Sequence, residues 1–345
     1  MPATIDLRSD TVTLPTPRMM EAISRVELGD DVYGEDPTVN RLQQLAAQKL
    51  GTEAALFVAS GTMGNLVAVL THCQRGDEMI VGDEAHVFYY EVGGSAALGG
   101  VHVRTVPNGR GVPSVADVET AVRGEDIHFP VTRLVCLENT HNRCGGVAIS
   151  AEDTNAVAAV AHRHGAKVHL DGARLFNAAV ALGVDPSQLV ENCDSVNVCL
   201  SKGLAAPVGS VLAGSAEFVA RARKFRKMVG GGMRQAGILA AAGIVALEEM
   251  VDRLAEDHAN ARVLAEGIHG LPGATVDLSA VQTNIVVIEI DRPDMTAAQF
   301  LSRMAERGVK LTAFGGKKVR AVTHYGIERG DVERAVEVAR KLLAK

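Results

Sequence analysis

The feature that most constrains the fold is an alternation of short apolar runs with helical segments between about Glu53 and Gly214. This order predicts an α/β protein with a mostly parallel, seven-stranded sheet sandwiched by helices. The runs Leu134–Leu137 and Val196–Leu200 are apolar almost throughout, as in strands that are buried on both faces. The expected strands are Ala54–Ala59, Met79–Gly82, Val101–Val106, Leu134–Glu138, Lys167–Leu170, Ser195–Leu200 and Ser210–Ala213. The expected helices between them include Thr62–His72, Val87–Leu98, Val115–Val122, Ala151–Arg163 and Leu175–Leu182.

A smaller unit is expected after the triple glycine 230–232. A helical stretch rich in alanine and leucine runs from Gln235 to roughly Gly270 and stops at Leu271-Pro272-Gly273. The remaining chain is predicted to form a small α+β unit, because its strand-like and helical segments alternate. We therefore expect an N-terminal segment 1–15, a large domain 16–250 and a small C-terminal α+β domain 251–345. The clearest segments of the small unit are Asn284–Ile290, Thr296–Arg307, Val319–Thr323 and Asp331–Ala344.

Composition and charge exclude several classes of protein. A net charge of −6 and a pI near 6.0 argue against broad nucleic-acid binding. No apolar run reaches the length of a membrane span, and Met1–Asp10 has no basic-then-apolar signal pattern. Five cysteines, an odd number, fit reduced intracellular thiols, so we expect a cytoplasmic protein. His141 and Cys144 lack a second pair of Cys or His at ligand spacing, and we expect no metal site.

A lysine at the end of an apolar run indicates cofactor chemistry. Lys202 follows Val196–Leu200 and precedes Gly203, and Asp171 ends another apolar run upstream. A desolvated lysine loses its charge readily and forms a Schiff base with a carbonyl. An aspartate held at a fixed distance keeps a pyridinium nitrogen protonated. Pyridoxal 5'-phosphate (PLP) requires both groups, so the pair predicts a PLP enzyme.

The segment Ser60–Asn65 follows the first clear strand and opens a helix. The free N–H groups of a helix start bind phosphate, and Thr62 adds a hydroxyl beside Gly61. A plain strand-to-helix turn with an N-cap is at least as compatible with this segment taken alone. The segment matches neither a Walker A loop nor the Rossmann glycine fingerprint.

Other candidates are weaker when each is taken singly. His86 lies between a strand and a helix, where it could stack on a flat ring, although a lone histidine is more often a cap or a surface residue. Arg174 follows Asp171 by three residues and could reach an anion, or form a local ion pair. Arg320 interrupts an apolar strand and suits a substrate carboxylate, or is an edge-strand charge that faces water. The basic residues around the triple glycine are either a solvated face or phosphate-binding cations.

Taken in order, these residues resemble the low-specificity L-threonine aldolases, a branch of the PLP enzymes of fold type I, which share the aspartate-aminotransferase-like fold. The resemblance runs nearly end to end. One departure is Gly61-Thr62-Met63-Gly64-Asn65, where many relatives read Gly-Thr-Gln-Ala-Asn. The matching segments are Asp6–Thr11, Gly29–Gly34, Glu138–Asn142, Asp171–Arg174, Leu200–Gly203, Gly230–Gln235 and Val322–His324.

The resemblance implies roles for individual residues. Lys202 would carry PLP, Asp171 would hold its ring nitrogen, and His86 would stack on the ring. Gly61 and Thr62 would bind the phosphate. The remaining roles implied are phosphate contacts lent by a neighbouring subunit for Lys227 and Arg234, substrate-carboxylate contacts for Ser9, Arg174 and Arg320, and a place near the substrate hydroxyl for His128.

The resemblance further implies a lyase that cleaves L-threonine, L-allo-threonine and other L-β-hydroxy-α-amino acids to glycine and an aldehyde, by retro-aldol chemistry. It places the enzyme in threonine catabolism and glycine biosynthesis, as a homotetramer built of two dimers that share active sites, with the N-terminal segment contributing to the site. The base for the hydroxyl proton is left open between His86, His128 and a water held between them. β-Elimination or racemisation on the same fold is the nearer alternative. A ligand sensor is disfavoured, because it could dispense with Lys202, Asp171 or Arg320.

Overall fold

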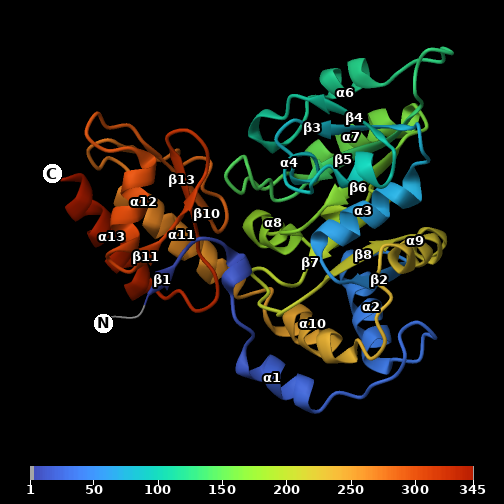
Figure 1. Ribbon diagram of the computed structural model, residues 1–345, viewed down its shortest axis with the longest axis horizontal. Coiled ribbons are helices and arrows are strands. Elements are labelled where there is room, and N and C mark those ends of the chain that lie inside the picture. The colour runs from blue at the N-terminus through green and yellow to red at the C-terminus, as the bar shows by residue number, and fades with distance from the viewer. Residues whose placement is uncertain (1–3, 345) are drawn as a thin grey trace.

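The computed structural model describes residues 4–344, which form two lobes (Figure 1). A seven-stranded sheet in the order β2-β8-β7-β6-β5-β3-β4 forms the centre of the larger lobe. Strands β3 to β7 run parallel to one another, whereas β8 is antiparallel to both of its neighbours. The predicted fold, a mostly parallel seven-stranded sheet, is therefore confirmed. The strands are Ala54–Val58 (β2), Glu78–Gly82 (β3), His102–Val106 (β4), Thr132–Glu138 (β5), Lys167–Asp171 (β6), Ser195–Cys199 (β7) and Ser210–Gly214 (β8).

Helices cover both faces of this sheet, as its apolar strands require. On one face, helices α3 (Gly61–His72) and α9 (Ala216–Met228) pack on alternate side chains of β2 and β8. On the other face, α2, α7, α8 and α10 bury apolar side chains of the sheet in one large core. The other helices of this lobe are α1 (Pro17–Ser24), α2 (Pro37–Leu50), α4 (His86–Tyr89), α5 (Gly94–Ala97), α6 (Val115–Ala121), α7 (Ala151–Arg163), α8 (Leu175–Leu182) and α10 (Gly237–Glu249).

Two of the expected helices are interrupted. The predicted helix Val87–Leu98 is two short helices, α4 and α5, because Val92 and Gly93 take left-handed backbone angles, with φ of 56° and 65°. Only glycine adopts such angles without steric cost, so two in succession end the helix. The predicted stretch from Gln235 to Gly270 is also two helices, α10 and α11 (Leu254–Ile268).

None of the helices described within residues 4–344 has the length and apolar character of a membrane span.

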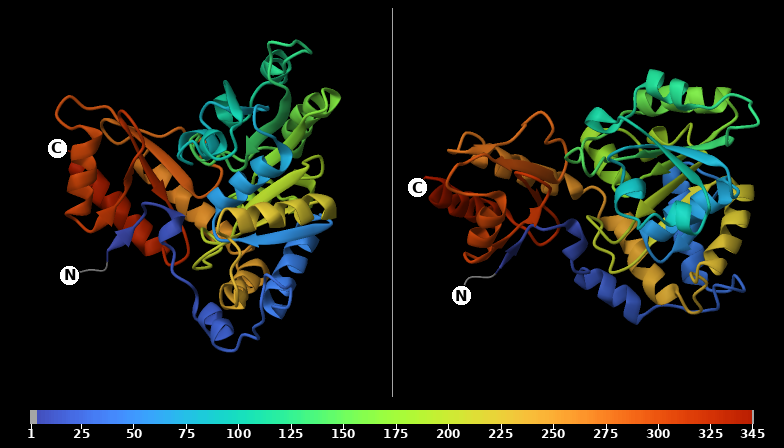
Figure 2. Two further views of the ribbon diagram at one scale, coloured as in Figure 1. Left: turned by 45° about the vertical axis from the view of Figure 1, so that its right-hand side comes forward. Right: turned by 45° about the horizontal axis from the view of Figure 1, so that its top comes forward.

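The N-terminal segment lies against the smaller lobe (Figure 2). This lobe has its own hydrophobic core, which includes Ile5 and Leu7 of that segment. A four-stranded antiparallel sheet, ordered β12-β13-β10-β9, packs against α11, α12 and α13. The N-terminal strand β1 pairs in parallel with β11 of this lobe. The predicted boundaries at residues 15 and 250 stay predictions, and residues 1–3 and 345 lie outside the described part. The elements are Ile5–Asp6 (β1), Ala274–Thr275 (β9), Ile285–Ile290 (β10), Ala297–Ala305 (α12), Val309–Lys310 (β11), Thr312–Ala313 (β12), Lys318–Val322 (β13) and Arg329–Leu343 (α13).

Candidate active site

Several predicted site residues lie at or just beyond the carboxyl ends of neighbouring parallel strands. Asp171 ends β6, Lys202 follows β7 by three residues, and His86 follows β3 by four. The carboxyl ends of parallel strands meet at one edge of a sheet, which is where α/β proteins bind ligands. Glu138, at the end of β5, accepts a hydrogen bond from the His86 backbone N–H at 2.6 Å and so ties two of these ends together.

The loop that carries Lys202 is held by its backbone. Ala205 N–H donates to the Lys202 carbonyl at 2.9 Å, and Ala206 N–H donates to the Leu200 carbonyl at 3.0 Å. A Cβ on Gly203 would lie 2.9 Å from the Leu254 side chain, which explains why glycine follows the lysine. Within residues 4–344 the Lys202 amine has no acidic partner closer than 4.0 Å, so it is not consumed by a structural ion pair.

Asp171 is a buried carboxylate with fixed hydrogen-bond partners. Its Oδ1 accepts from the Ala173 N–H at 3.1 Å, and its Oδ2 accepts from Asn65 Nδ2 at 2.9 Å. Arg174 pairs with Asp10 instead, so the alternative of a local ion pair between Asp171 and Arg174 is wrong. A buried carboxylate without a cationic partner is suited to the N–H of a pyridinium ring.

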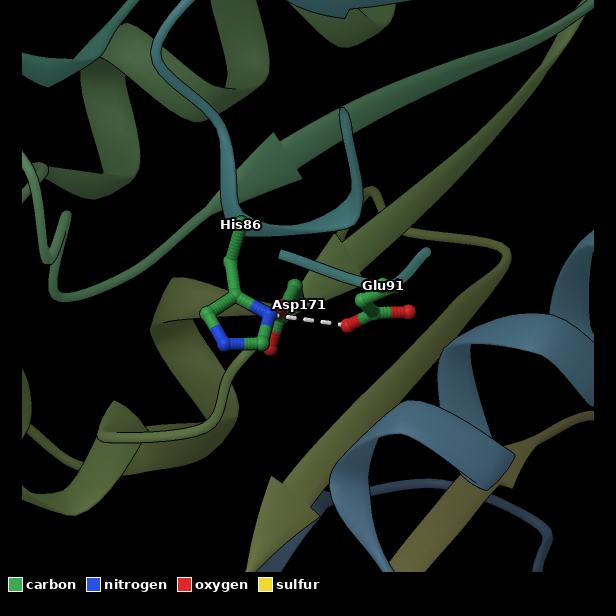
Figure 3. Close-up of side chains that lie close together, drawn as sticks. All are labelled: His86, Glu91 and Asp171. Carbon is green, nitrogen blue, oxygen red and sulfur yellow. Dashed lines mark hydrogen bonds and ion pairs between the residues drawn. The ribbon is translucent and has the colours of Figure 1, made fainter. Parts of the chain in front are cut away.

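His86 and Glu91 lie beside Asp171 (Figure 3). His86 Nδ1 is 2.9 Å from Glu91 Oε1, and the ring is tilted against Tyr90 with 5.3 Å between centroids. Burial lowers the pKa of His86, but the Glu91 bond and the Asp171 charge outweigh it, so the pKa lies above its ordinary value. Burial raises the pKa of Glu91. Sequence reasoning missed Glu91, because it was placed in the interior of a helix that the structure interrupts.

The facing atoms of His86, Glu91 and Asp171 lie within 4.8 Å of one another, a spacing that would also suit a metal ion. Each carboxylate oxygen that faces the cluster already accepts a hydrogen bond from Asn65. His86, Glu91 and Asp171 therefore belong to one hydrogen-bonded cluster. His141 and Cys144 likewise have protein partners: His141 Nε2 lies 2.6 Å from Asn108 Nδ2, and Cys144 Sγ lies 3.7 Å from the Asn108 carbonyl.

The start of α3 is the segment that is predicted to bind the phosphate. Ser60 caps the helix by accepting from the Met63 N–H at 3.2 Å, and Gly61 and Thr62 follow it as the first helical residues. A Cβ on Gly61 would lie 2.7 Å from Cys199 Sγ, so the close approach of the helix to β7 requires glycine. Ser210 Oγ is buried beside Gly61 without a partner among the described residues, a polar group that an anion or its water could satisfy.

A second group of charged residues is assembled from distant parts of the chain. Asp10 of the N-terminal segment accepts two hydrogen bonds from Arg174, both at 2.7 Å, and one from Asn284 Nδ2 at 3.2 Å. Burial alone would raise the pKa of Asp10, but the Arg174 guanidinium holds it well below its usual range. Ser9 lies next to this pair and accepts from Thr11 N–H at 3.2 Å. Sequence reasoning quoted Asp10 in a motif without giving it a role.

Arg320 on β13 lies near Arg174, and the two like charges repel. Burial lowers the pKa of Arg320, and the Arg174 charge lowers it further. Arg320 Nη1 donates to Asn142 Oδ1 at 2.7 Å, whereas its buried Nε has no partner among the described residues. The alternative of an edge-strand charge in water does not fit a half-buried side chain. Two guanidinium groups with one carboxylate between them leave positive charge for a bound anion.

The charge of Lys202 connects the two groups. It lowers the pKa of both Asp10 and His86, so the amine lies close enough to each group to act on it electrostatically. A lysine without an acidic partner, a buried aspartate and a glycine-lined helix start are the groups that PLP needs. The residues present therefore fit the cofactor that the sequence predicts.

Three predicted residues have no contact with this cluster within one chain. Arg234 pairs with Asp30 at 3.0 Å and is half exposed. The Lys227 side chain lies against Gly232, where a Cβ would meet its amine at 3.2 Å. His128 is 81% exposed, and its Nδ1 bonds to Asp126 at 2.6 Å. If these residues act at a site of this kind, a neighbouring subunit must bring them to it.

Comparisons with known proteins show which family the chain belongs to. The β-eliminating lyase family model matches residues 6–291. Low-specificity L-threonine aldolase 1 of Arabidopsis thaliana is 48% identical over 95% of this chain and 93% of its own length. The fold matches that of a Leishmania major threonine aldolase (TM-score 0.85, 20% identity, 98% of this chain and 99% of that one). It also matches a serine palmitoyltransferase with PLP bound (TM-score 0.77, 18% identity, 98% and 87%). The chain belongs to the β-eliminating lyase family and, within it, to the low-specificity L-threonine aldolases.

Proposed function

We propose that this enzyme cleaves L-threonine and L-allo-threonine, and other L-β-hydroxy-α-amino acids, to glycine and an aldehyde. The observation that carries the proposal is that Lys202 lines one pocket with Arg174, which pairs with Asp10, and acts electrostatically on both Asp10 and His86. The relatives named threonine aldolases, which match nearly the whole chain, support the choice of reaction. The cofactor is PLP, which when bound supplies an electron-accepting ring that stabilises negative charge at the substrate Cα.

The residues of the chain have separate tasks in this proposal. Lys202 provides the amine that attaches the cofactor, and Asp171 keeps a proton on the ring nitrogen. Gly61 and Thr62 hold the phosphate through their N–H groups and the threonine hydroxyl. The carboxylate of Asp171 is effective because it is buried, which strengthens its charge interaction with the ring.

The arginine end binds and orients the substrate. Arg174 keeps Nη1 for a ligand, since Asp10 occupies its Nε and Nη2. Arg320, with Ser9 nearby, would hold the other oxygen of the substrate carboxylate. Two-point binding of the carboxylate fixes the rotation about the bond between the substrate nitrogen and Cα, and so sets the direction of the Cα–Cβ bond that is to be broken.

A histidine removes the hydroxyl proton as the Cα–Cβ bond breaks. His86 is the candidate within the chain, either directly or through a water, and general-base assistance is worth roughly 10²–10⁴-fold in rate. We expect His86→Asn to lower kcat while PLP stays bound. Equal loss of PLP and of activity would instead assign His86 a structural role in cofactor binding.

We further propose that the active oligomer is a tetramer of two dimers with shared sites. Lys227, Arg234 and His128 lie away from the site of their own chain. His128 is flanked by the exposed apolar side chains of Ile127 and Phe129, and another subunit could cover them. Light scattering of the purified protein tests the tetramer, and a monomer with full activity would exclude the shared sites.

A cytoplasmic location and a role in threonine catabolism and glycine formation complete the proposal. All five cysteines are unpaired, which suits a reducing compartment. Fractionation of cells that produce the protein checks the location. Labelled threonine fed to those cells, followed by measurement of labelled glycine, checks the metabolic role.

The decisive experiment measures acetaldehyde and glycine formed from L-threonine and L-allo-threonine by the PLP-loaded protein, with D-threonine as the negative control. Equal amounts of the two products support the proposal, and the ratio of rates gives the preference for one diastereomer. No acetaldehyde from a yellow, PLP-loaded protein would contradict it.

β-Elimination is the second candidate, because the matching family model is described as a β-eliminating lyase. Release of ammonia and pyruvate from L-serine, without glycine and formaldehyde, would favour it. Conversion of L-alanine to D-alanine would indicate racemisation.

A further inference from the structure

Glu91 has no role in the reaction as described so far, yet it is buried against two site residues. One Glu91 oxygen, Oε1, is 2.9 Å from His86 Nδ1 and 2.8 Å from Asn65 Nδ2. The side chain is 5% exposed. Burying an acidic group costs free energy unless its hydrogen-bond partners compensate for the lost water. The buried position of Glu91 therefore needs a physical explanation.

The orientation of these partners is set by a chain of hydrogen bonds that starts at a backbone carbonyl. The Gly61 carbonyl can only accept, so Asn197 must turn its Nδ2 towards it, at 3.1 Å. The second hydrogen of the same Nδ2 points to Asn65 Oδ1, also at 3.1 Å. Asn65 Oδ1 is therefore an acceptor, and it lies 3.1 Å from His169 Nε2 as well.

Once Asn65 Oδ1 is fixed as the acceptor, the Asn65 Nδ2 group must face the two acids. Its two hydrogens point to Glu91 Oε1 at 2.8 Å and to Asp171 Oδ2 at 2.9 Å. Both carboxylate oxygens accept, since the amide nitrogen has no lone pair to offer. Glu91 and Asp171 are thus held at one amide, beside His86.

The contact with Glu91 also determines which ring nitrogen of His86 carries the proton. Because a carboxyl group is more acidic than an imidazolium, the proton shared between Glu91 Oε1 and His86 lies on Nδ1. His86 Nε2 points away from Glu91 and has no partner among residues 4–344 (Figure 3). A histidine whose Nδ1 donates to a carboxylate has a more basic and better oriented Nε2.

We infer that Glu91 is a positioning residue that holds the His86 ring by Nδ1, so that Nε2 is the nitrogen free to accept a proton. The inference deepens the proposed function, on which it rests for the reaction that uses this nitrogen. Asn65 couples the position of His86 to that of Asp171, because its side-chain amide donates hydrogen bonds to both Glu91 and Asp171. The tautomer of the histidine is then decided by the packing of α3 on β7.

Other charged groups also face His86, and a test must separate them from Glu91. The Asp171 charge raises the pKa of His86 and the Lys202 charge lowers it, whereas Glu138 bonds only the backbone of His86. Glu91→Gln keeps the size of the side chain and leaves these groups in place. Glu91→Asp keeps the carboxylate but withdraws it from Nδ1.

The experiment measures the rate at which diethyl pyrocarbonate acylates His86 as a function of pH, by peptide mass spectrometry on the full-length, PLP-loaded protein. The reagent attacks the unprotonated imidazole, so the midpoint of the rate gives the pKa. We expect a wild-type midpoint above 6.5 and a midpoint lower by roughly one pH unit in Glu91→Gln. Glu91→Asp should fall between the two. His128, whose partner is Asp126, is the internal control and should not shift.

In the same variants the acidic limb of the kcat profile should move with the His86 midpoint, while KM for L-threonine stays within about twofold. An unchanged His86 midpoint in Glu91→Gln would overturn the inference. If that variant fails to fold, an unchanged midpoint in Glu91→Asp overturns it equally. Failure of the proposed function is a separate result, because it would appear as no acetaldehyde from the wild-type protein.

Discussion

The two ends of the active site are built in different ways. The proposed cofactor end takes Asp171, His86, Glu91 and Asn65 from the larger lobe, within or near elements of a single sheet. The carboxylate end takes its charged groups from the N-terminal segment, from the residue before α8 and from β13 of the smaller lobe. Hydrogen bonds between amide and acidic side chains hold the first end together, whereas the Arg174–Asp10 ion pair holds the second.

This difference indicates which property of the enzyme a substitution at each end should change. The cofactor end is part of the core of the sheet, so its geometry is fixed once the lobe folds. The carboxylate end exists only when the N-terminal segment pairs with β11 and brings Asp10 to Arg174. Changes at the first end should alter chemistry and PLP binding, whereas changes at the second should alter substrate binding and stability.

The largest effect is expected for Lys202→Ala, which removes the amine that attaches the cofactor. We expect activity to fall on the order of 10⁴-fold or more, the size seen when a residue at the reacting centre is removed. Borohydride reduction followed by mass spectrometry checks the reason. A reduced PLP adduct on the variant would show that another lysine carries the cofactor.

Asp10→Asn should mainly destabilise the protein, since it leaves the buried Arg174 unpaired, at a cost of about 3–5 kcal/mol. The pKa of folded Asp10 is lowered, so its stabilising contribution is present above the unfolded value of about 3.9 and is lost as the pH falls below it. The wild-type Tm should therefore drop more steeply than that of the variant below about pH 4, as scanning calorimetry would show. Equal Tm values at pH 7 would contradict this account.

Asp171→Asn tests whether Asp171 acts on the cofactor and not on substrate binding. Loss of the carboxylate at the ring nitrogen should lower kcat by roughly 10²–10³-fold. KM should change little, because the substrate carboxylate is bound elsewhere. Steady-state kinetics and the absorbance of bound PLP measure both effects, and a rise in KM alone would assign Asp171 to the wrong end of the site.

Arg320→Leu is the converse test. We expect KM to rise by about 30-fold or more, the loss expected for truncating one partner of a buried charged contact, with PLP binding unchanged. Arg340→Leu on the exposed face of α13 is the matched control and should behave as wild type. Loss of PLP from Arg320→Leu would mean that the two ends are not independent.

The smallest effect is expected for His128→Asn. If the residue reaches the site across a subunit interface, kcat should fall by about tenfold, less than for His86→Asn. Mixed oligomers of His128→Asn and Lys202→Ala chains test the route: recovery of activity on mixing would support exchange between subunits. A variant that matches wild type would remove His128 from the mechanism.

The sequence by itself determined the lobe that carries the cofactor. Alternating apolar and helical segments predict the sheet, and a residue that follows a parallel strand must lie at its carboxyl edge. Asp171, Lys202, His86 and the glycine before Thr62 could therefore be placed near one another before any coordinates. The reason is that strand direction alone fixes which ends meet, and no side-chain contact has to be known.

Only the tertiary structure decided which side chains form ion pairs and hydrogen bonds with one another. Nothing in the spacing of Asp10 and Arg174, 164 residues apart, indicates a buried ion pair, and the local Asp171–Arg174 pair was an equally good reading. Glu91 was hidden because Val92 and Gly93 break the helix predicted around it. Hydrogen bonds between distant residues depend on how lobes and turns pack, and this is set by the whole core, which no short pattern in the chain records.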